Sequence, residues 1–174
     1  MMDMFTECLI KRRKSIKEYM LIFSLIILGV VATFFYLAFR YAILGGMLSG
    51  VGFAAVVMMW WGIIIATTNK NQEFEYTVTN SDVDIDTIIA RKKRRRIISF
   101  NAKDIEKMAP IEQLDEKMTF ARTIDASAHD DRFDVYFISA TVKGEKVKIL
   151  VNPSRKMLDI LKTFRPENII IGEE

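Results

Sequence analysis

Six consecutive basic residues, RKKRRR at positions 91–96, are the most chemically distinctive group in the chain. Lysine and arginine bind phosphates, carboxylates and other polyanions. A cluster of about four to eight such residues beside a membrane attracts anionic lipid at about 1 kcal/mol for each residue near the surface. The candidate contact residues for a lipid or another polyanion are Arg91, Lys92, Lys93, Arg94, Arg95 and Arg96.

Three interpretations of this basic run remain open. In the first, the run is the solvated tip of a β-hairpin, and its cations pair across the strands with Asp82, Asp84 and Asp86. Such surface pairs contribute little stability. In the second, the run faces anionic lipid. In the third, it binds an acidic protein or a nucleic acid, because a short basic run does not distinguish between polyanions. Of these two partners, nucleic acid is the less favoured.

The three aspartates before the run resemble the start of a calcium-binding loop. Counting from Asp82, an EF-hand requires glycine at position 6 and glutamate at position 12. The chain has Thr87 and Lys93 at these positions. The alternation of acidic and apolar residues instead indicates the solvated face of a strand.

Other polar residues do not form a recognisable catalytic or metal-binding motif. His129 and Cys8 are the only histidine and cysteine, which leaves no ligand set for zinc. A magnesium site at Asp130 and Asp131 is less favoured than a polar loop. No serine or cysteine is paired with a base, and the chain has no glycine-rich phosphate loop. We therefore predict no catalytic residues, no metal and no cofactor.

Two long uncharged segments precede the basic run and indicate that the chain is anchored in a membrane. Residues 19–39 and 44–66 contain no charged side chain and are separated by four residues. A helix over residues 19–39 would be about 31 Å long, close to the thickness of about 30 Å of a hydrocarbon core. The first segment is too long for the apolar part of a signal peptide. The pattern predicts a two-helix transmembrane hairpin over residues 19–66.

Flanking charges predict the orientation of this hairpin. Five Lys or Arg residues lie between positions 11 and 17, and Lys70 follows the second segment, whereas the connection carries only Arg40. Because positively charged flanks stay in the cytoplasm, both termini of this multi-pass cell-membrane protein should be cytoplasmic. Apolar residues within 1–18 recur near helical spacing, so we expect a basic amphipathic segment there that lies along the inner membrane surface.

The second segment contains a GxxxG motif formed by Gly46 and Gly50. Small residues at this spacing let two helix backbones approach closely in lipid. The motif favours packing between the two helices of the hairpin, with homodimerisation as the alternative.

Residues 72–174 have the composition of a folded cytoplasmic domain. They contain 18 Lys or Arg and 19 Asp or Glu, a net charge of −1 against +3 for the whole chain. Residues 102–128 are ambiguous between short helices and strands. Elsewhere, alternating apolar residues predict strands over 74–78, 83–89, 97–100, 133–142 and 145–151, the last two joined by a turn at Lys143-Gly144.

A single amphipathic helix is expected after the last strand. Asn152 is the expected N-cap, Pro153 suits the first turn, and Pro166 ends the helix. Its apolar stripe consists of Met157, Ile160, Leu161 and Phe164. Antiparallel strands followed by one such helix are the order of elements in a pleckstrin-homology-like (PH-like) barrel.

The stretch FEYTVTNSDVDIDTIIARKKRRRIISFNAKDIEKMAPI resembles the start of bacterial membrane-anchored PH-like domains, and NPSRKMLDILKTF is similar to the end of one. The whole chain also resembles a family of small two-span proteins from clostridia and related bacteria. The resemblance implies an α+β, mainly β, cytoplasmic PH-like barrel with a C-terminal helix. It further implies a binding or scaffolding module and brings no catalytic residue.

We therefore expect a non-enzymatic, membrane-anchored adaptor. Its partners would be anionic lipid, reached through residues 91–96, or a membrane or cytoplasmic protein that the sequence does not identify. The alternative is a small accessory subunit of a larger membrane complex, with the hairpin as its interface.

Overall fold

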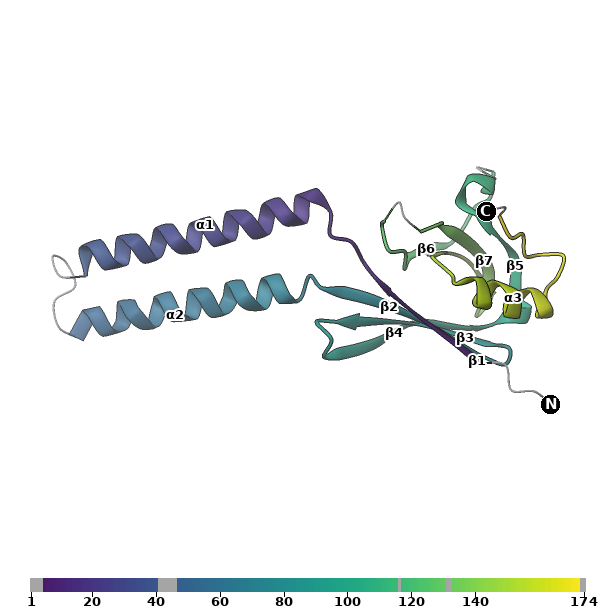
Figure 1. Cartoon of the computed structure of the whole chain (residues 1–174), viewed down its shortest axis with the longest axis horizontal. Helices are drawn as coiled ribbons and strands as arrows, with labels where there is room; N and C mark the ends of the chain where they lie inside the picture. The colour runs from purple at the N-terminus through teal and green to yellow at the C-terminus, as the bar shows by residue number, and fades with distance from the viewer. Residues whose placement is uncertain (1–4, 41–46, 116, 131–132, 173–174) are drawn as a thin grey trace. The chain divides into compact units, whose positions relative to one another are not determined.

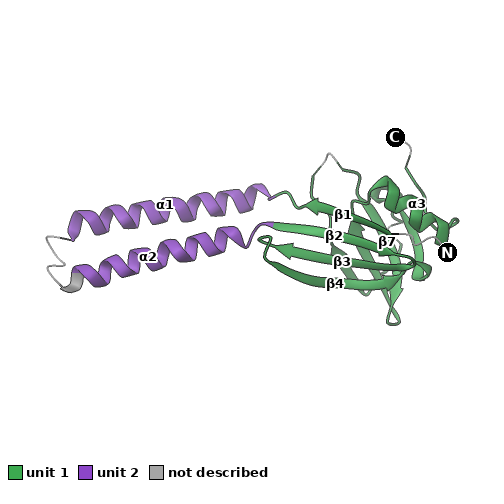
Figure 2. Ribbon diagram, turned by 60° about the horizontal axis from the view of Figure 1, so that its bottom comes forward, with its two compact units in different colours: residues 1–13, 72–174 green, residues 14–71 purple. Residues whose placement is uncertain are grey.

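A computed structural model describes residues 5–40, 47–115, 117–130 and 133–172 (Figure 1). The chain forms two compact units (Figure 2). The helical unit is the segment Lys14–Asn71. The β-unit combines the residues up to Arg13 with those from Gln72 onward, so the helical unit is inserted between the first two strands of the β-unit.

The helical unit consists of α1 (Ile16–Phe39) and α2 (Met47–Thr68), which lie side by side. The helix α1 begins three residues before the predicted segment, because Ser15 and Glu18 form a capping box. Both helices are long and apolar enough to cross a membrane by length and composition.

Of the described glycines Gly29 and Gly50, it is Gly29 that lies in close contact with the facing helix. A Cβ atom added at Gly29 would lie 3.0 Å from Cδ1 of Ile63 and 3.3 Å from the Trp60 ring, whereas one added at Gly50 would meet nothing within 4 Å. Gly46 lies outside the described residues. A polar contact supports the packing, because Nε1 of Trp60 donates a hydrogen bond of 3.0 Å to the hydroxyl of Thr33.

The first sheet of the β-unit has the order β1-β2-β3-β4, and all neighbouring strands are antiparallel. Its strands are β1 (Phe5–Lys11), β2 (Gln72–Thr79), β3 (Asp82–Ile89) and β4 (Lys93–Asn101).

The strand β1 corrects the expectation of an amphipathic helix within residues 1–18. Thr6, Cys8 and Ile10 alternate toward the interior of the β-unit, and Phe5 and Leu9 are exposed on the other face. The short apolar pattern fits either structure locally, and pairing with β2 decides it.

The second sheet has the order β5-β7-β8-β6, and β6 runs parallel to β8. The predicted hairpin around Lys143-Gly144 is confirmed as β7–β8, and the ambiguous region contributes β5 and β6. The strands are β5 (Ile105–Pro110), β6 (Arg122–Asp125), β7 (Tyr136–Val142) and β8 (Glu145–Val151).

The predicted C-terminal helix is confirmed as α3 (Arg155–Phe164). Its N-cap is Ser154 rather than Asn152, because the Ser154 hydroxyl accepts from the backbone N–H of Met157. Met157 and Leu161 of the predicted stripe are fully buried.

The expectation of a closed barrel is wrong. The chain turns at the 3₁₀ segment Ala102–Asp104 and starts a second sheet, and no ladder joins the two sheets in the described part of the chain. The inner faces of both sheets share one apolar core, and α3 contacts β1 and the 3₁₀ turn. The β-unit is therefore an open two-sheet structure with a helix at its corner.

Candidate ligand cleft and basic turn

The basic run begins in a tight turn and continues along β4. Ala90 and Arg91 have positive φ angles of 54° and 56°, and the N–H of Lys92 donates to the Ile89 carbonyl at 3.0 Å. This is the geometry of a type I′ turn, whose twist matches that of the flanking strands. From Lys93 onward the basic side chains are strand residues, so they alternate between the two faces of the sheet.

Cations on the outer face of the first sheet are neutralised by acids of the neighbouring strands. Nε of Arg94 lies 2.8 Å from Oδ2 of Asp86, and the same guanidinium also contacts Glu75. Arg96 lies 3.0 Å from Asp84 and 3.2 Å from Asp86. The expected pairing with aspartates is therefore confirmed for Asp84 and Asp86.

The contacts of the basic run with Glu73 and Glu75 on β2 were not anticipated from the sequence. Nε of Arg91 lies 3.3 Å from Oε1 of Glu73 on β2. Asp82, in contrast, accepts a hydrogen bond from Asn101 and pairs with no residue of the basic run that the structure describes. Of the six candidate residues, Arg91, Arg94 and Arg96 are held by carboxylates within the sheet.

The remaining three cations have no carboxylate partner in the described ranges. Lys92 belongs to the turn, and the register places Lys93 opposite Ile89 and Arg95 opposite Thr87. The side chains of Lys93 and Arg95 therefore lie on the face of β4 opposite to Arg94 and Arg96. Within the basic run, the positive charge available to a ligand therefore lies at the turn and on this inner face.

Glu75, like Asp86, is a buried acid of the outer-face network. Burial raises the pKa of its carboxyl group, and the Arg94 guanidinium opposes this effect. A hydrogen bond and charge repulsion from Glu7 on β1 raise the pKa further. Glu75 and Asp86 thus share the Arg94 guanidinium, and this shared ion pair holds Arg94 on the outer face of the sheet.

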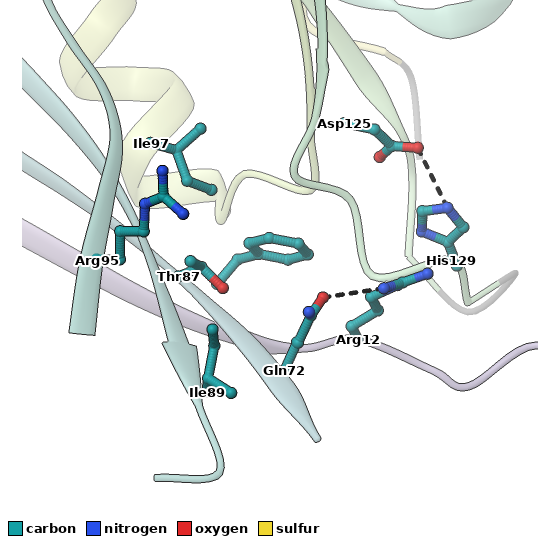
Figure 3. A pocket seen from close by; sticks show the side chains of 9 residues that line it. Arg12, Gln72, Thr87, Ile89, Arg95, Ile97, Asp125 and His129 are labelled. Carbon is teal, nitrogen blue, oxygen red and sulfur yellow. Dashed lines mark hydrogen bonds and ion pairs between the residues drawn. The ribbon is translucent and has the colours of Figure 1, made fainter. Parts of the chain in front are cut away.

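A cleft of about 380 Å³ lies on the inner face of the first sheet (Figure 3). Its apolar lining consists of Phe74 on β2, Ile89 on β3 and Ile97 on β4. Its polar lining consists of Arg12, Gln72, Thr87, Arg95, Asp125 and His129. The cleft therefore combines two guanidinium groups with an apolar surface.

Arg12 and Gln72 lie at one end of the cleft, next to the inserted hairpin in sequence. The Arg12 side chain donates a hydrogen bond of 2.9 Å to Oε1 of Gln72, and its backbone N–H donates to the Gln72 carbonyl at 3.0 Å. The ladder between β1 and β2 therefore extends up to the residues that lead into and out of the helical unit.

The wall of the cleft that faces the first sheet is the loop after β6 (Figure 3). His129 has a φ angle of 54°, and its Nε2 lies 3.1 Å from Oδ2 of Asp125. The Ser127 hydroxyl donates to the other oxygen of Asp125 at 2.7 Å.

Asp130, the first candidate magnesium ligand, lies 3.6 Å from Arg13, and Asp131, the second, is outside the described residues. Among the described residues, no group of three His, Cys, Asp or Glu side chains could hold a metal ion.

Two buried polar residues support this wall. The Asn152 side chain accepts from the backbone N–H of Ala128 at 2.6 Å and donates to the carbonyls of Phe133 and Asp134. The hydroxyl of Tyr76 donates to the Ala126 carbonyl, and burial raises the pKa of this tyrosine. These bonds hold the loop at a defined distance from the first sheet.

A family model described as bacterial PH-like domain (DUF6106) matches residues 2–171. The chain belongs to this family. The match begins before β1 and includes the helical unit, so the hairpin insertion lies within the PH-like family pattern. The expected resemblance to bacterial PH-like domains is thereby confirmed, whereas the clostridial, two-span part of it stays a prediction. No match was found among curated proteins or among solved structures.

Proposed function

We propose that this PH-like protein is a membrane-anchored, non-enzymatic binding module whose β-unit contacts anionic lipid on the cytoplasmic face. The observation that carries the proposal is the set of three cations, Lys92, Lys93 and Arg95, that have no carboxylate partner in the described part of the chain. PH-like domains are generally non-catalytic binding modules, which agrees with this assignment.

The surface of the helical unit supports membrane anchoring. Large apolar side chains along both helices are exposed, including Phe23, Leu28 and Trp61. Leaving such side chains in water would cost about 25 cal/mol per Å² of apolar surface. Hydrocarbon removes this cost, and both helices are long enough to cross it.

Pairing between β1 and β2 supports an even number of crossings. Residues before α1 and after α2 belong to neighbouring strands of one sheet, as in the pair Lys11 and Glu73. They must therefore lie on the same side of any membrane that the hairpin crosses. The basic residues that flank the helices favour the cytoplasmic side.

Short connections make weak lipid contacts effective. Four residues separate β1 from α1, and three residues separate α2 from β2. An extended chain spans at most about 3.6 Å per residue, so the β-unit of an anchored protein must stay beside the bilayer. Three cations contribute about 1 kcal/mol each near an anionic surface. Tethering raises their effective concentration at that surface, so this modest attraction is sufficient for contact.

The second candidate function is that of a subunit in a larger membrane complex. An added Cβ at Gly50 or at Gly62 meets nothing within 4 Å, so these two glycines of α2 face open space. Small residues that face away from the hairpin suit close approach of a further helix, either from another protein or from a second copy.

Reconstitution of the full chain into nanodiscs tests the lipid proposal. An environment-sensitive fluorophore is attached to a cysteine at Lys92, or at the exposed Lys103 beyond the other end of β4, each in a Cys8→Ala background. We expect a blue shift at position 92 when phosphatidylglycerol is added to phosphatidylcholine, and no shift at position 103. The shift should disappear in 1 M salt, where the Debye length is about 3 Å. Equal emission from position 92 in both lipids at low salt would exclude the proposed contact.

A further inference from the structure

The two faces of β4 separate structural cations from available ones. Arg96 and Arg95 are adjacent in the sequence, but Arg96 contacts Asp84 and Asp86 on the outer face, and Arg95 lines the cleft on the inner face. A diffuse polybasic patch would use both arginines equally. The structure instead places one of them in a shaped site.

We propose that the cleft binds the head group of one anionic amphiphile, with its anion on Arg95 and its adjacent apolar part on the floor of the cleft, which extends from Arg95 toward Arg12 (Figure 3). This inference rests on the proposed lipid-binding function and assigns its ligand to a site. It differs from a surface contact because it requires a single molecule, a defined position and both a charged and an apolar part.

Charge in the cleft favours an anionic group. The guanidinium groups of Arg12 and Arg95 line it, and the lining carboxylate of Asp125 is held beside His129 at 3.1 Å. Guanidinium groups bind phosphate and carboxylate through paired N–H donors, and such charge-assisted bonds are stronger than hydrogen bonds between neutral groups. The same two guanidinium groups repel a metal cation.

The floor of the cleft favours a ligand with an apolar part. Phe74, Ile89 and Ile97 form three of the nine lining residues and lie on three adjacent strands of one sheet. Thr87 and Gln72 add hydroxyl and amide groups that can bond to a glycerol-like or ester group beside the anion. A volume of about 380 Å³ accommodates a head group and the first carbons of a chain but not a whole lipid.

The cleft contains its own spectroscopic reporter. His129 is the only histidine of the chain and lines the wall that faces the sheet, so its imidazole NMR signals report on the cleft alone. The full chain is labelled at histidine and kept in micelles of a neutral detergent. The probe is dihexanoyl phosphatidylglycerol, added below its critical micelle concentration.

We expect saturable shifts of the His129 signals with this probe and none with dihexanoyl phosphatidylcholine. Arg95→Gln should weaken binding about tenfold or more, because it removes a charge-assisted contact. The matched control Arg96→Gln should weaken it less than about threefold, because it changes an outer-face ion pair. The loss of affinity in Arg95→Lys should lie between these two values, since lysine keeps the positive charge but lacks the planar, bidentate guanidinium group.

Three results would overturn the inference. Equal weakening by the two glutamine variants would show that the cations act as a diffuse surface, and the nanodisc shift at position 92 would still support the proposed function. Saturation of His129 by inorganic phosphate as tightly as by the lipid would show that the ligand is a free phosphate-type anion without an apolar part. No response of His129 to any probe would exclude the cleft as a site. Only loss of the nanodisc shift contradicts the proposed function itself.

Discussion

Tyr76 on β2 donates its hydroxyl hydrogen to the carbonyl oxygen of Ala126 at 2.5 Å, across the interior from the first sheet to the loop after β6. The backbone N–H of Asn152 donates to the same hydroxyl at 3.4 Å. This buried phenol therefore couples β2 of the first sheet to the loop that carries His129.

Removing the hydroxyl should destabilise the β-unit and loosen that wall. Tyr76→Phe leaves the Ala126 carbonyl without this donor in a buried position, which costs about 1–3 kcal/mol. Hydrogen exchange of the full chain in detergent should show faster exchange of the β6 amides and of the loop that follows. The exposed Tyr19 on α1 offers the matched control, and Tyr19→Phe should leave this exchange unchanged. Unchanged exchange in Tyr76→Phe would show that the bond does not hold the loop.

Acid should destabilise the second sheet through Glu106. Hydrogen bonds from Lys146 and Thr141 lower the pKa of this carboxyl below its ordinary value of 4.5. A lowered folded-state pKa gives stability that is present above the unfolded value and is lost as pH falls through the folded value. Because the pair is partly exposed, the effect should stay below about 1 kcal/mol. Glu106→Gln should reduce stability at pH 7 and remove this loss in acid.

The contribution of Glu75 to stability should change with pH in the opposite direction, so Glu75 serves as the comparison for Glu106. Burial raises its pKa above 4.5, so the folded state binds the proton more tightly than the unfolded state. Its contribution to stability therefore falls as pH rises from 4.5 through the folded value. The difference in stability between Glu75→Gln and the parent should move in favour of the variant over that range. A pH profile of the same sign for both variants would contradict the assigned environments.

Packing of the helical hairpin should depend on Gly29 and not on Gly50. A leucine at Gly29 would overlap Ile63 and Trp60 and should cost about 1–3 kcal/mol by forcing the helices apart. The bond from Trp60 to Thr33 would be lost, so tryptophan emission in detergent should shift. Gly50→Leu should leave the emission of the isolated chain unchanged, and equal shifts in both variants would contradict the observed contact.

The β-unit should fold without the hairpin only if β1 is kept. Because the Arg12 N–H bonds to the Gln72 carbonyl at 3.0 Å, a short turn can replace residues 14–71 and join the two strands directly. This shortened chain should be soluble and show strand and helix by circular dichroism. The fragment 72–174 lacks the strand that covers Tyr76 and Phe74 at the sheet edge, so it should aggregate or melt at lower temperature. Equal melting of the two proteins would show that β1 is dispensable.

Local patterns in the sequence were sufficient to predict the two long helices and the β7–β8 hairpin. The uncharged runs predict α1 and α2, and the alternation around Lys143-Gly144 predicts β7 and β8. These elements depend on contacts between residues that are close in the chain, and their periodicity is strong.

Non-local pairing accounts for what the sequence did not reveal. Arg12 and Gln72 are 60 positions apart, and no local pattern marks β1 as a strand of the domain that resumes after the hairpin. The parallel pairing of β6 with β8 and the open arrangement of the sheets are equally non-local. That the basic side chains alternate between the two faces of β4 could have been predicted from the sequence, because successive residues of a strand point to opposite faces of the sheet. The bulge near Ile85 and the acids of β2 required the structure.

Every proposal above requires that the hairpin crosses the membrane and keeps the β-unit on the cytoplasmic side. The most direct measurement is labelling of intact cells with a membrane-impermeant thiol reagent, using single cysteines in a Cys8→Ala background. A cysteine at Ala42, in the connection between the two helices, should react in intact cells. A cysteine at the exposed Lys103 of the β-unit should react only after the membrane is permeabilised. Labelling at position 103 in intact cells would contradict the account.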